Sequence, residues 1–400
     1  MPDLLYVSLM RLPTEKAHGL QIMQNCEAFA DAGYTVTLWV ARRWNTPDMR
    51  AIDDVFAYYG VKANFKIHRI PCLDLFPLFP ADGWGARIAF YVQLVTYILS
   101  LMIVLVFKQA DVYYSRDEAL LYVMSLLKSH QKLAYEAHLF PASGRGAKLQ
   151  RDVIARVHSV IAITPKLRDD LVAQRGANPD RTIVAHDGIR QARFETMSDR
   201  VSARQQLGWD EQAFIVGFVG RLQMIGMDKG VGTLVQALAQ VGDAHFALVG
   251  GPDEGADVLR QQWLELGLPE ERFLYAGHVQ PDAVPLYLSA FDVCAMPHPH
   301  TTQFAYYTSP LKLFEYMASK SAIVASDLPA WADVVTHEES ALLVPPSDVE
   351  ALAKAIQRLK NQPDLREKLA GNAYKCVMSD YTWSARADKI LKHIGHHNSP

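Results

Sequence analysis

Short apolar runs alternate with longer amphipathic segments along the whole chain. In the first half these runs occupy residues 4–9, 35–40, 66–70, 112–114, 133–135 and 160–163. In the second half they occupy residues 215–220, 245–250, 272–276, 293–296, 322–326 and 341–344. Short runs bounded by loops are typical of buried strands, and helical segments between them are typical of parallel sheets. The pattern therefore predicts an α/β protein with a doubly wound sheet in each half.

The length of the chain agrees with this division. Its 400 residues, of which 50% are hydrophobic, are more than one ordinary core accommodates. A polar, charged passage that ends near Arg204 separates the two sets of strands and is a candidate linker. We expect an N-terminal domain over residues 1–195, a C-terminal domain over residues 196–380, and a helix within residues 381–400 that packs on the first domain.

An unusually apolar stretch follows the third predicted strand. A loop rich in proline and aromatic residues leads into residues 88–107, which are almost continuously apolar. About 20 apolar residues just span a bilayer, but Gln93, Thr96 and Ser100 recur at helical spacing and form a polar stripe. We favour a helix buried in the first domain. A peripheral membrane contact of the 76–107 region and a transmembrane span remain the alternatives.

The composition excludes several classes of function. A net charge of −3 without a run of like charges provides no basic surface for nucleic acid. The four cysteines are far apart and form no Cys-x-x-Cys pair, which indicates reduced thiols rather than a disulfide framework or a zinc site. The N-terminus lacks the basic and apolar layout of a signal peptide. We therefore expect a cytoplasmic protein.

One helix in the second half predicts an anion site. Ser309 followed by Pro310 is typical of an N-cap and a first helical position. The next two amides, of Leu311 and Lys312, would then be unpaired and available to a phosphate, with the Lys312 ammonium beside them. Glu315 lies on the same helix face and would accept hydrogen bonds from a ribose. An ordinary capped surface helix with an ion pair explains the same residues, so both interpretations stay open.

Glycines and cations follow several predicted strands at their carboxyl ends. Gly220-Arg221 ends one strand and Asp228-Lys229-Gly230 precedes the next helix, where Arg221 and Lys229 could clamp one phosphate. Gly19 lies in the turn after the first strand, and His138 follows a later strand, where open α/β sheets bind ligands. A simple loop glycine and a structural histidine explain these two residues equally well. Neither a Gly-x-Gly-x-x-Gly nor a P-loop pattern is present at these turns, which disfavours a dehydrogenase or a P-loop nucleotidase.

Taken together, these segments resemble a known family. Gly220-Arg221 with Asp228-Lys229-Gly230, the segment 309–318 (Ser-Pro-Leu-Lys-Leu-Phe-Glu-Tyr-Met-Ala) and Tyr381-Thr382-Trp383 are similar to motifs of the retaining GT-B glycosyltransferases of family 4, the glycosyl transferases group 1. The resemblance covers nearly the whole chain and is strongest from residue 204 to residue 383. It implies two facing Rossmann-like domains with a cleft between them, a nucleotide-sugar donor on the C-terminal domain, an acceptor on the N-terminal domain, and no metal or other cofactor.

The resemblance also implies roles for individual residues. It places His138 near the reacting sugar and Glu315 on the ribose, while Arg221 and Lys229 neutralise the departing diphosphate. The implied catalytic residues are His138, Arg221, Lys229 and Glu315. The residues expected to bind the donor are Gly19, Gly220, Val279, Ser309, Leu311 and Lys312.

Two features depart from the family pattern. Tyr307 stands where the family often has the first glutamate of Glu-x7-Glu, and the loop between Arg221 and Lys229 is longer than usual. The first glutamate commonly helps to hold the donor sugar. The departures therefore leave the sugar specificity open and are compatible with weak or altered catalysis.

The resulting hypothesis is transfer of a hexosyl group, with retention, from a nucleoside diphosphate sugar to a cell-envelope glycan or a lipid-linked sugar. The apolar 76–107 region favours the lipid-linked acceptor and a location at the inner face of the membrane. A nucleotide-sugar 2-epimerase is an alternative, but it needs a set of acid and base carboxylates that the sequence does not reveal. A catalytically silent sugar-nucleotide-binding protein is a second alternative, because Tyr307 replaces a glutamate. The donor base, the sugar and the oligomeric state have no signal in the sequence.

Overall fold

The chain forms two compact units, each built around a parallel sheet. The computed structural model of the protein describes residues 1–79, 83–224 and 226–396. Unit 1 comprises Met1–His186 together with the chain from Trp383 onward, and unit 2 comprises Asp187–Thr382. Residues 80–82 of the predicted 76–107 contact region, and the last four residues of the predicted terminal segment, lie outside the described residues.

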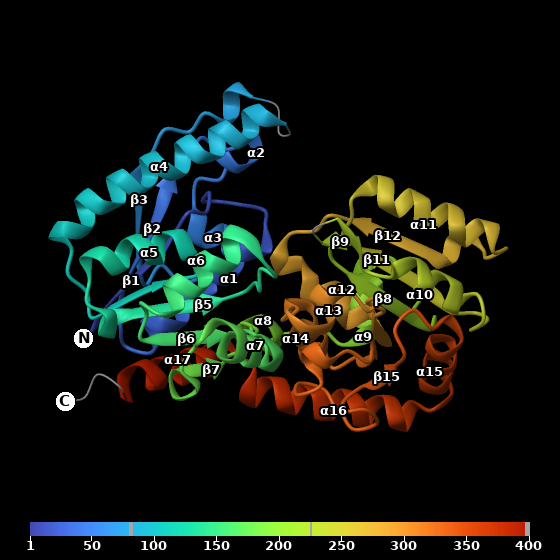
Figure 1. The fold of residues 1–400 in the computed structure, drawn as a ribbon. Coiled ribbons are helices and arrows are strands. Elements are labelled where there is room, and N and C mark those ends of the chain that lie inside the picture. The colour runs from blue at the N-terminus through green and yellow to red at the C-terminus, as the bar shows by residue number, and fades with distance from the viewer. Residues whose placement is uncertain (80–82, 225, 397–400) are drawn as a thin grey trace. The chain divides into compact units, whose positions relative to one another are not determined.

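Unit 1 contains a seven-stranded sheet in the order β3-β2-β1-β4-β5-β6-β7, with every neighbouring pair parallel. Its strands are β1 (Asp3–Ser8), β2 (Thr35–Arg42), β3 (Lys66–Pro71), β4 (Val112–Ser115), β5 (Leu133–Ala137), β6 (Ser159–Ala162) and β7 (Thr182–Val184). Its α-helices are α1 (Ala17–Asp31), α2 (Pro47–Arg50), α3 (Val55–Tyr59), α4 (Trp84–Phe107), α5 (Glu118–Leu127), α6 (Gly144–Ile154), α7 (Pro165–Arg175) and α17 (Trp383–His396). The last of these, α17, packs against α1 although most of the chain separates them (Figure 1).

Unit 2 contains a six-stranded parallel sheet in the order β12-β11-β8-β13-β14-β15 and a short antiparallel hairpin of β9 and β10. Its strands are β8 (Ile215–Val219), β9 (Gln223–Met224), β10 (Met227–Asp228), β11 (His245–Val249), β12 (Phe273–Gly277), β13 (Val293–Met296), β14 (Ala322–Ser326) and β15 (Leu342–Val344). Its α-helices are α8 (Ala192–Glu195), α9 (Arg200–Leu207), α10 (Val231–Leu238), α11 (Asp253–Glu265), α12 (Val284–Ala290), α13 (Thr302–Tyr306), α14 (Leu311–Ala318), α15 (Val349–Asn361) and α16 (Pro363–Asp380).

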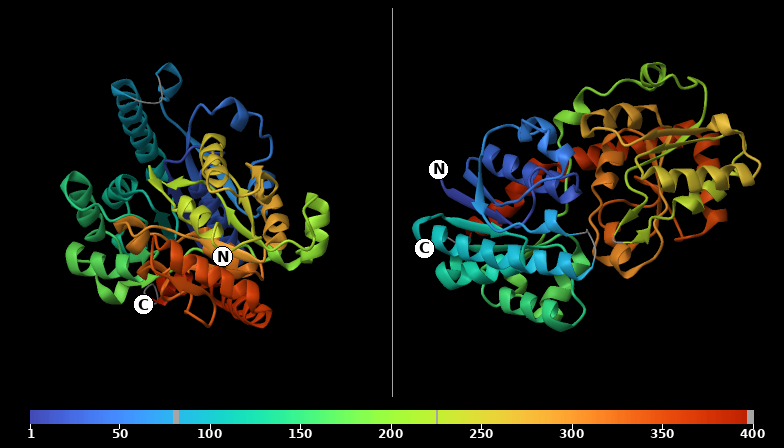
Figure 2. Two further views of the ribbon diagram at one scale, coloured as in Figure 1. Left: turned by 90° about the vertical axis from the view of Figure 1, so that its right-hand side faces the viewer. Right: turned by 90° about the horizontal axis from the view of Figure 1, so that it is seen from above.

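Helices cover both faces of each sheet, as Figure 2 shows from two further directions. The central strands are therefore apolar on both faces; β8 and β13, for example, are buried along their whole length. In unit 2 the two faces of the sheet bury separate apolar clusters. The predicted α/β architecture of two doubly wound, Rossmann-like units is confirmed.

The strand order determines where each unit can bind a ligand. The order reverses between β1 and β4 in unit 1 and between β8 and β13 in unit 2. Helices that follow the two strands at such a point leave in opposite directions and open a crevice at the carboxyl ends of the strands. The functional residues of each unit are therefore expected at this edge of its sheet.

Helix α4 departs from the prediction that the apolar stretch is a buried helix. It is the one described helix that is long and apolar enough to cross a membrane, yet only 22% of its most apolar window is buried. One stripe along the helix, which includes Gln93, Tyr97 and Leu101, packs into unit 1, and the Tyr97 hydroxyl donates to the Ser8 carbonyl over 3.1 Å. The prediction was wrong because α4 is apolar on nearly every side, whereas the fold covers only one of them.

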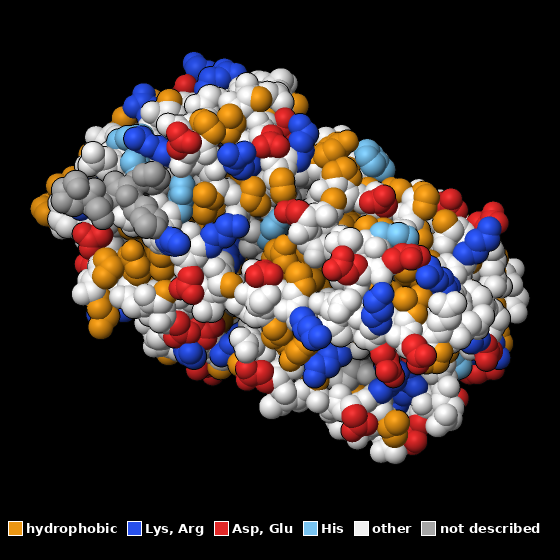
Figure 3. All heavy atoms as spheres, turned by 90° about the horizontal axis from the view of Figure 1, so that it is seen from below, with side chains coloured by type: hydrophobic (Ala, Val, Ile, Leu, Met, Phe, Trp, Pro, Cys, Tyr) orange, Lys and Arg blue, Asp and Glu red, His pale blue; other side chains and the backbone are white. Residues whose placement is uncertain are grey.

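Charged side chains show no segregation on the face drawn in Figure 3. Among the described residues of that face, Lys and Arg are interspersed with Asp and Glu. This mixture agrees with the small net charge of −3.

Candidate functional site

Two glycine turns form the carboxyl edge of the unit 2 sheet beside the reversal point. Gly220 follows β8 with φ +112°, and Gly250 follows β11 with φ +125°. A Cβ on Gly250 would lie only 2.4 Å from the Gly220 carbonyl oxygen, so the two backbones touch. Glycine is thus required by both conformation and space. The result is an edge of bare backbone that a ligand can approach closely.

The Lys312 ammonium lies against this edge. Its Nζ atom is buried, lies 4.0 Å from the centre of the Phe218 ring, and would be 3.0 Å from a Cβ on Gly220. Among the described residues no hydrogen-bond partner is found for this atom. Burial and repulsion by Lys229 hold the pKa of Lys312 well below its usual range, although Glu315 acts in the opposite direction. A buried cation without an acceptor is costly, so binding of an anion here would stabilise the charged form of Lys312.

Lys229 is fixed beside Lys312 by a tight turn. Its amide donates to the Leu222 carbonyl over 3.0 Å, and the next residue, Gly230, has φ +77°. A Cβ on Gly230 would lie 1.9 Å from the Pro297 carbonyl oxygen, so this turn also excludes any side chain. Burial, followed by repulsion from Arg221, lowers the pKa of Lys229 to about 8. Arg221 itself is exposed.

Glu315 lies one turn into α14, where its environment opposes ionisation. Burial raises the pKa of this carboxyl, while Arg193 and then Lys312 act to lower it. Arg193 belongs to α8 and forms an ion pair with Asp282 at 3.1 Å. The sequence interpretation missed Arg193, because no motif connects it to a helix more than one hundred residues later in the chain.

The start of α14 differs from the prediction. The helix begins at Leu311 with Pro310 as its N-cap, so Ser309 is not the N-cap. The Ser309 hydroxyl instead accepts a hydrogen bond from the Asp187 amide over 2.9 Å, which diverts it from the helix end. The Leu313 amide donates to the Pro310 carbonyl, and the amides of Leu311 and Lys312 precede this first pair.

Tyr307 and Val279 are two further residues of unit 2 for which the sequence led to a prediction. Tyr307 is the C-cap residue directly after α13, and its amide donates to the Gln303 carbonyl over 3.0 Å. Val279 is half-buried and packs against an apolar core cluster of unit 2. Its contact with a nucleobase stays a prediction, as does the effect of Tyr307.

In unit 1, His138 follows β5 and is joined to a buried carboxylate. Its Nε2 lies 2.5 Å from Oε1 of Glu136, and the other oxygen of Glu136 lies 3.0 Å from the Arg386 guanidinium of α17. Tyr114 and Asn25 also donate hydrogen bonds to this carboxylate. Glu136 and Arg386 were not recognised in the sequence, because a buried pair so far apart along the chain leaves no local pattern.

This network determines the protonation of His138. Burial and repulsion by Arg116 lower the pKa of His138 to about 4, against the opposing effect of Glu136. Burial acts to raise the pKa of Glu136, but Arg386 and His138 hold it well below its usual range. At neutral pH the carboxylate is therefore charged and the imidazole neutral, with its Nε2–H donating to Glu136.

Gly19 has a packing role that the structure makes explicit. It is the third residue of α1, and a Cβ there would lie 2.5 Å from Cγ2 of Thr14 and 2.6 Å from the Tyr59 hydroxyl. That hydroxyl bonds to both the amide and the carbonyl of Thr14 and shapes the loop after β1. The expected contact of Gly19 with donor phosphates stays a prediction.

The predicted site residues are divided between the two units. Gly19 and His138 belong to unit 1, and the others belong to unit 2. In unit 2 the electrostatic contacts of Lys312 link it to both Lys229 and Glu315. Over residues 1–79, 83–224 and 226–396, no group of three or more His, Cys, Asp or Glu side chains is placed to hold a metal ion.

Comparison with known proteins gives a consistent picture. Residues 213–362 match the family model described as glycosyl transferases group 1. A D-inositol 3-phosphate glycosyltransferase of Rhodococcus jostii is 27% identical over 253 residues, which cover 61% of this chain and 53% of that protein. The matched part thus spans little more than half the length of this curated relative.

Solved structures are similar over nearly the whole chain. Sucrose-phosphate synthase from Thermosynechococcus elongatus superimposes with a TM-score of 0.76 at 22% identity and covers 99% of both chains. HepE of Anabaena, solved in complex with UDP, gives a TM-score of 0.72 at 19% identity, with 99% of this chain and 100% of that chain covered. These likenesses confirm the predicted GT-B class of fold.

Proposed function

We propose that the protein transfers a hexosyl group from a nucleoside diphosphate sugar to an acceptor with retention of configuration, since residues 213–362 match the family of glycosyl transferases group 1. The observation that supports this most directly is the buried Lys312 ammonium, which lacks an acceptor beside the bare Gly220 turn. A diphosphate would supply the missing negative charge. The description of HepE in complex with UDP and UDP-glucose supports a nucleotide-sugar donor.

In the proposed mechanism the chain stabilises the charge that develops on the leaving diphosphate. Arg221, Lys229 and Lys312 provide cations, and the first amides of α14 provide neutral donors. The leaving phosphate then takes the proton of the acceptor hydroxyl on the same face of the sugar. His138 is neutral at pH 7 and is assigned to support the sugar as positive charge develops on it.

The charge supplied by these side chains leads us to propose a reaction that needs no metal or other cofactor. Turnover should then be the same before and after treatment with EDTA. A rate that disappears with EDTA and returns with added Mg²⁺ would contradict this part of the proposal.

The proposed acceptor is a cell-envelope glycan or a lipid-linked sugar, with the enzyme in the cytoplasm and in peripheral contact with the membrane. The exposed apolar side chains of α4 support this choice of acceptor over a freely soluble sugar. No nucleic-acid partner is proposed.

A panel of UDP-, GDP- and ADP-sugars tests the assignment. Diphosphate release that increases with acceptor supports transfer, and NMR of the product anomer tests retention. An isomerised donor would indicate a 2-epimerase instead. Binding of the donor without release or isomerisation would indicate a silent binding protein.

The silent alternative has one specific observation in its favour, namely Tyr307 at the position of a family glutamate. The variant Tyr307→Glu provides a direct test, because a carboxylate there would accept hydrogen bonds from the donor sugar. A gain of turnover from an inactive parent would support a silent native protein. Turnover by the parent itself would eliminate that alternative.

A further inference from the structure

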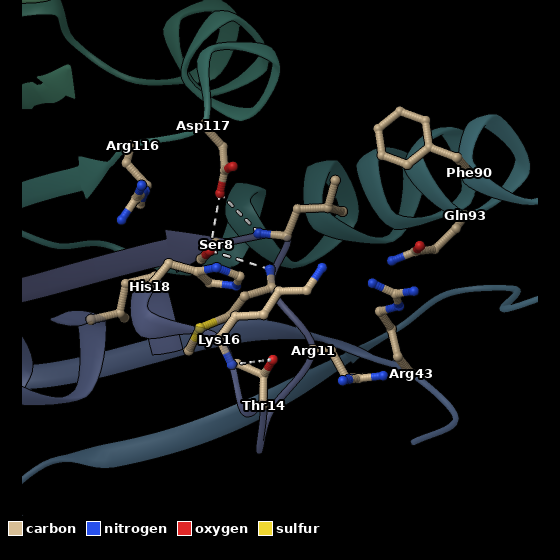
Figure 4. Close-up of a pocket in the computed structure, with 13 residues that line it drawn as sticks. Ser8, Arg11, Thr14, Lys16, His18, Arg43, Phe90, Gln93, Arg116 and Asp117 are labelled. Carbon is tan, nitrogen blue, oxygen red and sulfur yellow. Dashed lines mark hydrogen bonds between the residues drawn. The ribbon is translucent and has the colours of Figure 1, made fainter. Parts of the chain in front are cut away.

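A pocket at the carboxyl edge of the unit 1 sheet is not used by the proposed donor chemistry. It has a volume of about 350 Å³ and lies among the ends of β1, β2 and β4, the loop after β1 and helix α4. Four cations line it, namely Arg11, Lys16, Arg43 and Arg116, against one carboxylate, Asp117 (Figure 4). The pocket is therefore electropositive.

Arg11 forms an ion pair with Glu15 at 2.6 Å, so the excess of positive charge rests on the other three cations. Asp117 accepts hydrogen bonds from the Ser8 hydroxyl at 3.0 Å and from the Leu9 amide at 2.9 Å, so its carboxylate holds the loop after β1. Arg43 reaches Asp74 only at 3.7 Å, and its buried Nε has no hydrogen-bond acceptor among the described residues. Burial lowers the pKa of Arg43, with Asp74 opposing this effect.

Gln93 is a second buried polar group of the pocket without a partner among the described residues. Its side chain extends from α4 into the pocket and is directed toward Arg43, as Figure 4 shows. The residue is only 1% exposed, and neither its amide nitrogen nor its amide oxygen has a hydrogen-bond partner within the described chain. Buried amides are normally paired. A phosphoryl group would accept from the Gln93 nitrogen and the Arg43 Nε together, and its hydroxyl or an adjacent sugar hydroxyl would donate to the Gln93 oxygen.

The other side of α4 is an exposed apolar surface. Its side chains include Trp84, Tyr91, Leu99, Ile103 and Phe107, with exposed fractions of 74%, 61%, 57%, 65% and 84%. Aromatic residues lie at both ends and aliphatic residues in the middle, a distribution typical of segments at a membrane interface. The chain contains no Asp or Glu between residues 83 and 110.

Cations accompany this apolar surface. The edge strand β3, against which α4 packs, has Lys66 and Arg69 exposed, and Arg87 is exposed on α4 itself. An apolar helix that carries no carboxylate and lies beside exposed cations complements a bilayer that contains anionic lipids. One helix thus presents an apolar surface on its outer side and Gln93 to the pocket on its inner side.

We propose that the acceptor is an anionic lipid taken directly from a membrane surface, with its phosphoryl group in the Arg43–Gln93 pocket and α4 seated at the bilayer interface. The inference rests on the proposed glycosyl transfer and specifies its acceptor. It does not involve the donor residues of unit 2, so donor binding can be measured as an independent control.

Sedimentation with lipid vesicles tests the surface. The full chain should bind vesicles of phosphatidylcholine with 30% phosphatidylglycerol about tenfold more tightly than vesicles of phosphatidylcholine alone. The triple variant Tyr91→Ser, Leu99→Gln and Ile103→Gln should lose at least about tenfold of this binding while it binds UDP normally. A matched control, Val258→Gln with Leu264→Gln, changes exposed apolar residues of α11 and should bind vesicles like the parent chain. Equal vesicle binding by the parent and the triple variant would overturn the membrane assignment.

Titration with small phosphoryl compounds tests the pocket. Geranyl phosphate should bind the parent chain at least about tenfold more tightly than it binds Arg43→Gln or Gln93→Leu, because each variant removes one donor. Two variants are used so that a folding defect in one, detected by circular dichroism, does not decide the result. The opposite result is a parent chain that binds inorganic phosphate as tightly as geranyl phosphate and fails to bind vesicles. This result would indicate a soluble phosphorylated acceptor and overturn the lipid proposal.

The donor control separates this inference from the proposed function. A tenfold loss of UDP affinity in Arg43→Gln would assign the pocket to the donor and overturn the acceptor site. Failure of every nucleotide sugar to turn over, combined with the expected vesicle and geranyl phosphate results, would contradict the proposed transfer and leave the binding site intact.

Discussion

The two units differ in how a buried charged group is paired at the carboxyl edge of the sheet. In unit 1 the Glu136 carboxylate is surrounded by Arg386, His138 and two neutral donors. In unit 2 the Lys312 ammonium has no hydrogen-bond partner within the described chain and is repelled by Lys229. A buried charge is tolerated only where partners replace its lost hydration. The first charge is thus part of the scaffold, and the second is the group that we propose to bind a ligand of opposite charge.

The largest expected effect is the loss of stability when the buried Glu136 carboxylate of unit 1 is removed. Glu136→Ala should lower the free energy of unfolding by about 3–5 kcal/mol, because it leaves Arg386 buried without a counter-ion. Urea denaturation followed by tryptophan fluorescence measures the change. The double variant Glu136→Leu with Arg386→Met removes both charges and should recover much of the loss. A single variant as stable as the parent chain would show that the network has no structural role.

A large effect on activity is expected when a lysine of the unit 2 site is removed. Lys229→Ala should lower turnover about 10²- to 10³-fold, since it removes a cation from the proposed site of the leaving diphosphate. Its unfolding free energy should stay at or above that of the parent chain. Lys354→Ala is a matched control because that lysine is exposed and forms an ion pair with the neighbouring Glu350 at the surface. Near-normal turnover of the Lys229 variant would refute the donor assignment.

The low pKa values of the lysines predict that donor affinity depends on pH. Lys229 loses its proton in the free protein as the pH rises through about 8, whereas a bound diphosphate favours the charged form. The affinity for UDP should therefore be highest below pH 8 and should decrease by about tenfold between pH 7 and pH 9. Calorimetry in buffers of different ionisation heat should detect proton uptake on binding. A Lys229→Met variant should lose most of this dependence, and an unchanged slope in the variant would contradict the assignment.

The smallest effect concerns the stability of the ligand-free protein. Lys312→Met retains the aliphatic packing near Phe218 but removes an unpaired buried amine, so it should raise the free energy of unfolding by about 1 kcal/mol. The same variant should bind UDP at least about tenfold more weakly. A destabilised variant would show that Lys312 makes a stabilising interaction in the ligand-free protein.

Much of the fold follows from the sequence because strand and helix periods are local properties. The apolar runs at 4–9 and 215–220, for example, became β1 and β8 with nearly the predicted bounds. Lys312 and Glu315 were correctly placed on one helix, since their spacing alone puts them on one face. Ser309 was assigned wrongly, because a tertiary hydrogen bond to the Asp187 amide outweighed its local preference as an N-cap.

Other parts of the site depend on contacts that no local pattern records. Arg386 meets Glu136 only after the chain has completed unit 2 and returned to unit 1. The exposure of α4 likewise depends on how many neighbours the fold provides, and the apolar sequence is the same for a buried helix and an uncovered one. Sequence periodicity predicts which residues share a face, whereas the fold decides whether that face is covered.

The return of α17 to unit 1 has a consequence for how the protein is made. Glu136 leaves the ribosome about 250 residues before Arg386, a delay of roughly 10–50 s at ordinary rates of synthesis. During that interval unit 1 has neither its last helix nor the counter-ion of its buried carboxylate, so it cannot reach its final state. Unit 2, which is contiguous in the chain, is able to mature first although it is synthesised second.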